Sequence, residues 1–207
     1  MVHVYMRGGG CAEDVRTMLH GRQSDAAWGL LWDVLAREHP LQDLPLPTER
    51  DAHGKPRFPD APDIHFNLSH SAGYAVCALA DTPVGVDVQV WRRLKRPVEG
   101  RFHPLERELL GMTDEASCRE AFFCLWTAKE SFMKADGRGL RIPLDAFCTV
   151  SEEELGAGSL IYDRPVRVRQ EVNEGDYYVW RHRVREGVSL AACASGDGGF
   201  IYEDVRA

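Results

Sequence analysis

The sequence predicts an α+β fold, because segments with a helical pattern and segments with a strand pattern both occur along the chain. Apolar residues recur at helical spacing in residues 24–40 and 114–136. They alternate or run together in residues 64–90 and again beyond residue 144, as in strands. A chain of 207 residues with 44% hydrophobic residues is long enough for one substantial domain or two small ones that share a core.

The first predicted helix begins at Ser24, which can cap it, with Asp25 near its positive end. Apolar side chains then follow at positions i, i+3, i+4 and i+7: Trp28, Leu31, Trp32 and Leu35. Pro40 ends this helix, and the Pro-, Asp- and Gly-rich residues 41–57 are expected to be irregular.

Three strands are predicted next, followed by a basic loop and a short helix. The strands cover residues 64–68, 74–79 and 84–90. Residues 92–101 are interrupted by Pro and Gly and therefore predict a loop, and residues 104–110 predict a helix that begins with Pro.

The second half begins with the longest predicted helix, residues 114–136, which ends at Gly137. Strands are predicted after it at residues 144–150, 166–172, 177–184 and 188–194. Residues 73–78 and 187–194 resemble each other slightly, which hints at two related halves.

Composition and charge exclude several classes of function. The chain has 25 basic and 32 acidic residues, a net charge of −7, which argues against nonspecific nucleic-acid binding. Neither a signal peptide nor a membrane-spanning run is apparent, so a cytoplasmic protein is expected. The six cysteines have no zinc-ligand spacing and are interpreted as reduced core residues.

Glu130 and Lys134 lie four residues apart on the long helix, so they share one face. An exposed salt bridge is the simplest interpretation of such a pair. However, large aromatic residues and two following glycines surround the pair in the sequence, which favours a position at the border of a cleft.

Asp87 lies in the middle of an apolar predicted strand, where an aspartate is seldom buried without a partner. It is either a hydrogen-bonded structural residue or a metal ligand. Gln89 shares its strand face. Oxygen ligands from few carboxylates suit Mg²⁺, whose octahedron is completed by phosphate oxygens and water.

A third polar cluster combines Ser69 and His70 with Lys55. Hydroxyl, imidazole and ammonium groups at a strand end favour an anion. His70 is alternatively a hydrogen-bonded turn residue. A serine hydrolase is not indicated, because the sequence has no GxSxG motif.

Taken together, these segments resemble the surfactin-synthetase-activating class of 4′-phosphopantetheinyl transferases. Residues 126–140, WTAKESFMKADGRGL, match the signature W-x-x-K-E-[SA]-x-x-K-x-x-G-x-G-L of that class. Residues 85–88 (GVDV), 66–71 (FNLSHS) and 54–56 (GKP) match its other motifs in order and spacing. The similarity covers about residues 22–150.

The resemblance implies two similar α+β halves, residues 1–90 and 91–207, related by a pseudo-twofold axis with the active site between them. It implies a monomer that moves phosphopantetheine from coenzyme A to a serine of an apo carrier protein, with Mg²⁺ or alternatively Mn²⁺. The implied catalytic residues are Asp87, Glu130 and Lys134, and the implied metal ligands are Asp87, Glu130 and Gln89. The residues expected to bind coenzyme A are Lys55, Ser69, His70, Lys129 and Arg22.

Gln89 departs from the family pattern, which often has a second acid at this position. Its amide oxygen can coordinate a cation but contributes no charge. Two alternatives to a transferase remain open: a degenerate homologue that binds coenzyme A or a carrier without transfer, and a Mg²⁺-dependent hydrolase of pyrophosphate bonds.

A basic segment follows the strand of Asp87. Its residues are expected either to dock an acidic carrier helix or to form a solvated loop: Arg92, Arg93, Lys95, Arg96 and Arg101.

Overall fold

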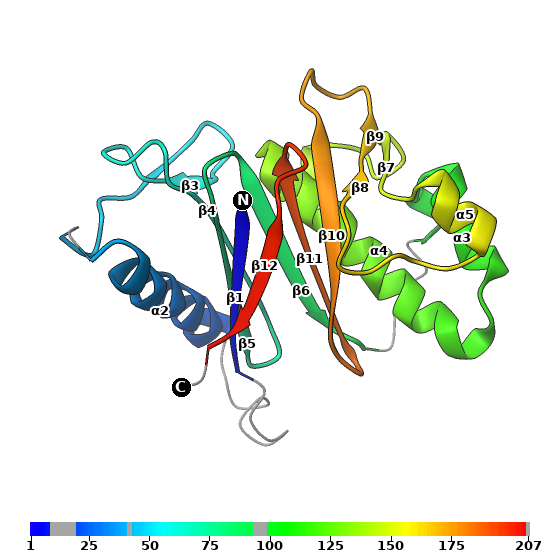
Figure 1. The fold of residues 1–207 in the computed structure, drawn as a ribbon, viewed down its shortest axis with the longest axis horizontal. Helices are drawn as coiled ribbons and strands as arrows, with labels where there is room; N and C mark the ends of the chain where they lie inside the picture. Colours follow the sequence, from blue (N-terminus) through cyan, green and yellow to red (C-terminus); the bar gives the residue numbers. More distant parts are fainter. Residues whose placement is uncertain (9–19, 41–42, 93–98, 206–207) are drawn as a thin grey trace.

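The computed structural model describes residues 1–8, 20–40, 43–92 and 99–205, which form four layers (Figure 1). Helix α2 (His20–Glu38) is one outer layer, two four-stranded sheets lie in the middle, and helix α4 (Glu115–Asp136) covers the second sheet. This arrangement confirms the predicted α+β class. No helix in the described part of the chain is both long and apolar enough to span a bilayer.

The two sheets exchange strands. The first has the order β12-β1-β5-β4, with bounds Phe200–Asp204, Val2–Gly8, Tyr74–Ala80 and His65–Ser71. The second has the order β6-β11-β10-β8, with bounds Val84–Val90, Val188–Ser195, Tyr177–Arg185 and Val166–Arg167. β6 follows β5 directly in sequence but pairs with β11, and the C-terminal strand β12 pairs in parallel with β1. The first sheet therefore contains one strand from the C-terminal end of the chain, β12, and the second contains one strand from the N-terminal half, β6.

Smaller elements complete the fold. The helices are α3 (Pro104–Met112) and α5 (Glu152–Ala157), with 3₁₀ turns at Glu99–Arg101 and Gly139–Arg141. Two short strand pairs are β2 (Glu49–Arg50) with β3 (Pro56–Arg57), and β7 (Phe147–Cys148) with β9 (Arg169–Gln170).

Alternation along the strands divides the interior into layers. Val84, Val86 and Val88 of β6 join the core between the two sheets. The intervening residues of β6 therefore face the layer of α4, because successive strand side chains point to opposite faces. The apolar face of α2 packs on the outer face of the first sheet, and that of α4 packs on the second.

Gly85 allows α4 to approach β6 closely. A Cβ atom at this position would lie 2.1 Å from the carbonyl oxygen of Ser131 and 2.4 Å from the backbone nitrogen of Ala135. Only a glycine fits at such a contact between two backbones. Gly85 therefore sets the distance between β6, which carries Asp87, and α4, which carries Glu130.

Most elements occur where the sequence predicts them, with several corrections. α4 has its N-cap at Asp114, and Gly137 ends it with a φ of 95°. Ser24 lies inside α2 (His20–Glu38), so it does not cap that helix. The predicted strands 144–150 and 166–172 are reduced to the short strands β7, β8 and β9.

Four strands and one helix were not predicted: β1, β12, α5, and the short pair β2 and β3, which lies in the segment expected to be irregular. The cysteine prediction holds for Cys77, Cys124, Cys148 and Cys193, which are free and buried. Cys118 is exposed on α4, so it is not a core residue. Cys11 lies outside the described residues.

Candidate functional site

Side chains of β4 bind the free edge of β6 and thereby join the two sheets. The N–H groups of Val86, Val88 and Val90 donate to Asn67 Oδ1 at 2.9 Å, Ser69 Oγ at 3.2 Å and Ser71 Oγ at 3.0 Å, respectively. Every second residue of β4 thus satisfies every second N–H of β6, which would otherwise be an unpaired sheet edge. This contact places the FNLSHS segment beside the GVDV segment.

Asp87 projects from β6 toward α4 and is 8% exposed. Its Oδ1 atom accepts hydrogen bonds from Ser69 Oγ at 2.9 Å and from Lys134 Nζ at 2.7 Å. The Lys134 ammonium also donates to the carbonyl oxygen of Val86 at 2.9 Å. The aspartate is therefore held by one residue from each neighbouring element, β4 and α4.

Glu130 lies one helical turn before Lys134 and faces the same site. Burial and the nearby Asp87 carboxylate raise the pKa of Glu130, while the Lys134 ammonium opposes that shift. Within the described part of the chain, no hydrogen bond or ion pair holds its half-buried carboxylate. A half-buried carboxylate without a partner is unfavourable, so this site favours an added cation.

The donor set suits a small divalent cation. Asp87 and Glu130 supply two carboxylates, and Gln89 lies on the same strand face as Asp87. The Gln89 amide donates through Nε2 to Ser71 Oγ at 3.1 Å and to the Val90 carbonyl at 2.9 Å. The atom of Gln89 with the chemistry of a cation ligand is its amide carbonyl oxygen. No cluster of three His, Cys, Asp or Glu residues suitable for a metal occurs in the described ranges, so other ligands must come from the substrate or water.

Lys55 lies at one end of this site, beside a pocket of about 290 Å³. Its ammonium donates to the carbonyl oxygens of Val84 at 3.0 Å and Ala135 at 3.1 Å, which links it to both β6 and α4. Burial lowers the pKa of Lys55 to about 8. The pocket is lined by Asp51, Lys55, Pro56, Arg57, Phe58, Pro62, Ile64, His65, Phe66, Pro83, Ala135, Asp136 and Gly137.

Ser69 and His70 occupy different faces of β4. The Ser69 hydroxyl donates to Asp87, so in this structure it supports the aspartate. His70 is half-buried on the opposite face, which β4 shares with Phe66 and Leu68 toward α2. The structure therefore does not bring His70 to the side of Asp87.

The predicted helix began at Ser24, which placed Arg22 before it. In the structure Arg22 lies within α2, and its side chain is outside what the structure describes. Of the predicted basic loop, Arg92 and Arg101 are exposed. Arg93, Lys95 and Arg96 lie outside the described residues.

Lys129 was expected to contact phosphate, and its position contradicts that expectation. Its side chain is 0% exposed and its ammonium pairs with Glu106 Oε2 at 2.7 Å, donates to the Phe147 carbonyl at 2.8 Å and lies 3.9 Å from the Phe147 ring centre. Burial lowers the pKa of Lys129, and Glu106 opposes this shift. Lys134 lies five positions after Lys129, which places the two side chains on different faces of α4.

Sequence reasoning missed Glu106, the partner of Lys129. This carboxylate also accepts hydrogen bonds from the backbone and side chain of Thr149, both at 2.9 Å, and caps α3 through the His103 N–H at 3.1 Å. The only available sequence signal was an acid at position N3 of a helix that begins with proline, which is typical of a capping box.

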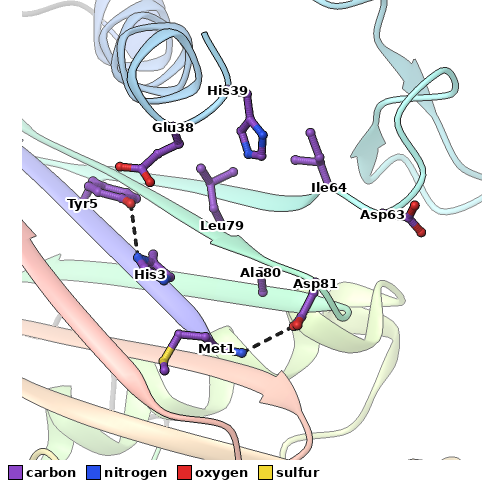
Figure 2. Close-up of a pocket in the computed structure, with 10 residues that line it drawn as sticks. All are labelled: Met1, His3, Tyr5, Glu38, His39, Asp63, Ile64, Leu79, Ala80 and Asp81. Carbon is purple, nitrogen blue, oxygen red and sulfur yellow. Dashed lines mark hydrogen bonds and ion pairs between the residues drawn. The ribbon is translucent and has the colours of Figure 1, made fainter. Parts of the chain in front are cut away.

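A second pocket, of about 270 Å³, lies between β1, β5 and the end of α2, and none of the predicted site residues lines it (Figure 2). The Tyr5 hydroxyl is 3.3 Å from His3 Nδ1, and the amino group of Met1 lies 3.5 Å from Asp81. Burial raises the pKa of Tyr5 to about 12, so the phenol stays neutral. This pocket is separate from the site around Asp87.

Comparisons with known proteins identify the family to which this chain belongs. A family model described as "ACPS: 4'-phosphopantetheinyl transferase superfamily" matches residues 83–193, which include β6 and α4. The chain is 31% identical to the 4'-phosphopantetheinyl transferase Sfp of Bacillus subtilis over 88% of this chain and 80% of the relative. It is 40% identical to the 4'-phosphopantetheinyl transferase gsp of Aneurinibacillus migulanus over 59% of this chain and 54% of the relative. The chain belongs to the 4′-phosphopantetheinyl transferase superfamily, in its surfactin-synthetase-activating class.

Proposed function

We propose that this transferase moves the phosphopantetheine arm of coenzyme A to a serine of an apo carrier protein, with a divalent cation held by Asp87 and Glu130. One observation carries the cation site: the half-buried Glu130 carboxylate, which has no hydrogen-bond or ion-pair partner among the described residues, lies beside Asp87 on a helix that a glycine brings close to β6. Mg²⁺ is the proposed ion and Mn²⁺ a substitute, because the donors are all oxygen atoms.

In the proposed reaction, the carrier serine oxygen forms a bond to the β-phosphorus, and the bond from that phosphorus to the bridging oxygen breaks. The electron pair leaves with adenosine 3′,5′-bisphosphate. The bound cation supplies charge neutralisation and orientation of the diphosphate. Glu130, directly or through water, accepts the serine proton. Lys134 stabilises charge on the leaving phosphate.

We assign the nucleotide of coenzyme A to the Lys55 pocket, where ammonium and aromatic groups meet. Ser69 supports Asp87 and is also proposed to contact coenzyme A. His70 and Arg22 are proposed to contact the 3′-phosphate. Gln89 is proposed as the third, neutral ligand of the cation.

We further propose that residues 1–90 and 91–207 are two similar halves related by a pseudo-twofold axis, and that the protein is a cytoplasmic monomer. The exchange of β6 and β12 between the two sheets supports the first point, since each half lends one strand to the sheet of the other. Size-exclusion chromatography with light scattering tests the oligomeric state.

The basic segment after β6 is proposed to dock the acidic helix of a carrier. Arg92 is exposed and follows β6 directly, close in sequence to Asp87. Reversing Arg92 and Arg93 to Glu should raise the KM for the carrier and leave coenzyme A binding unchanged, because charge at a docking rim acts mainly on encounter. Unchanged carrier kinetics in this double variant would remove the docking proposal.

Mass spectrometry of an apo carrier incubated with the protein, coenzyme A and Mg²⁺ tests the function. We expect the carrier to gain the mass of the phosphopantetheine arm, and we expect a chelator or Glu130→Ala to prevent this gain. No mass gain in the presence of tight coenzyme A binding would indicate a degenerate homologue. Release of adenosine 3′,5′-bisphosphate without any carrier would indicate a hydrolase.

A further inference from the structure

The Lys134 ammonium already binds the carboxylate that is proposed to hold the cation. It lies 2.7 Å from Asp87 Oδ1, and it is further fixed by the Val86 carbonyl at 2.9 Å. Ser69 donates to the same carboxylate oxygen at 2.9 Å. That oxygen thus has two donors before any metal arrives.

Lys134 differs in this respect from the other cations nearby. Lys55 donates to two backbone carbonyls, and Arg138 pairs with Asp136 at 2.6 Å. Among the residues that the structure describes, Lys134 is the one basic side chain in ion-pair contact with Asp87. It partly neutralises the charge of Asp87 and Glu130 in the protein without ligands.

A divalent cation that binds Asp87 would share the carboxylate with this ammonium, which occupies Oδ1. An ion bound to Asp87 would lie within a few ångströms of Nζ, where like charges repel strongly in a partly buried site. Lysine has a flexible four-carbon stem, and this side chain is 26% exposed, so the ammonium can turn away. It then needs another anion, and the diphosphate of coenzyme A supplies one at the same site.

We propose that Lys134 is an internal counter-ion of Asp87 that must leave for the metal to bind tightly, and that the bound diphosphate receives it. The inference rests on the proposed metal site at Asp87 and Glu130. It implies that metal and coenzyme A each strengthen the binding of the other, since such coupling is reciprocal. Lys134 therefore makes the empty site bind metal poorly, in addition to its proposed action on the leaving phosphate.

Mn²⁺ binding, followed by electron paramagnetic resonance of the free ion, tests this without any turnover. For Mn²⁺ alone, we expect Lys134→Met to bind at least about fivefold more tightly than the wild type, the lower end of typical coupling between sites. Lys134→Arg keeps the charge and should bind as weakly as the wild type. Lys55→Met is the matched control, because Lys55 also donates to a β6 carbonyl but contacts no carboxylate at ion-pair distance.

The second arm adds saturating coenzyme A. We expect coenzyme A to tighten Mn²⁺ binding in the wild type by about fivefold or more, and by clearly less in Lys134→Met. Thermal unfolding of each variant verifies that it is folded. Because Lys134 is partly exposed, its replacement should leave the fold intact.

The inference is overturned if Lys134→Met binds Mn²⁺ as weakly as the wild type or more weakly. It is also overturned if Lys55→Met increases the affinity for Mn²⁺ as much as Lys134→Met does. In either case the metal site itself stands if Glu130→Gln removes Mn²⁺ binding. Absence of Mn²⁺ binding from every variant, with and without coenzyme A, overturns the metal site and the inference together. The carrier mass assay reports independently whether the transfer activity holds.

Discussion

Lys129 and Lys134 lie five residues apart on α4, and both were expected to serve the same phosphates, yet their surroundings differ. Lys129 is fully buried among α3, β7 and α4 and is paired with Glu106, whereas Lys134 is partly exposed and reaches Asp87 on β6. The first pair has every partner it needs inside the protein. The pair of Lys134 and Asp87 lies beside a further carboxylate, Glu130, which has no hydrogen-bond or ion-pair partner among the described residues. This difference separates a charge that holds the fold from charges that are available to a ligand.

The largest expected effect comes from Glu130→Gln. We expect kcat/KM for carrier modification to fall by about 10³-fold, since a group acting on transition-state charge is lost. Thermal stability should stay the same or rise slightly, because burial and the Asp87 carboxylate outweigh the attraction between Lys134 and the Glu130 carboxylate. Transfer kinetics and thermal unfolding of the same preparation measure both effects. A strongly destabilised protein would contradict the proposed role.

Lys129→Met should give the opposite result. Removing one partner leaves the Glu106 charge buried without compensation, which costs about 3–5 kcal/mol of unfolding free energy. Denaturant unfolding measures this loss. Coenzyme A binding to the folded fraction should not change.

The double variant Lys129→Met, Glu106→Gln sharpens this contrast. Removing both charges should recover most of the stability, and it should recover transfer activity together with it. Recovered stability with a strongly raised KM for coenzyme A would restore the original prediction that Lys129 contacts phosphate.

Gly85→Ala tests the distance between the two regions. The added methyl group overlaps the Ser131 carbonyl, so α4 must move away from β6. We expect a loss of about 1–3 kcal/mol in unfolding free energy, as for other overpacked positions. Transfer activity should fall by a larger fraction than the unfolding free energy, because Glu130 and Lys134 move with the helix. Gly29→Ala, at a helical position with open space around it, is the control and should be neutral or stabilising.

The smallest expected effect is a pH dependence of coenzyme A binding. Lys55 is charged below its pKa of about 8 and neutral above it, so its attraction for a phosphate is lost as the pH rises. From about pH 7 to about pH 9, we expect the KM for coenzyme A to rise roughly fivefold, which corresponds to about 1 kcal/mol for a partly exposed ion pair. Lys55→Arg stays charged and should flatten the profile. An unchanged KM in the wild type would remove Lys55 from the nucleotide site.

Local patterns predicted the long elements correctly. Val84–Val90 alternates over the whole of β6, and α4 has both a capping aspartate and a terminating glycine, so short-range signals alone defined these elements. β1 and β12 were missed, since each depends on pairing with a segment far away in the sequence. The strand at residues 144–150 was overestimated because only Phe147 and Cys148 pair with β9, while the other apolar residues of the segment fill the core.

For the site, sequence spacing fixed which residues of α4 share a face, and it grouped Glu130 with Lys134 because the helical repeat allows no other arrangement. It did not reveal which structure covers each face. Only the tertiary structure decided that Glu106 neutralises Lys129 inside the core, while Asp87 receives Lys134 at the edge of a sheet. The physical reason is that a charged side chain takes its role from burial and from partners distant in the chain, neither of which its own segment determines.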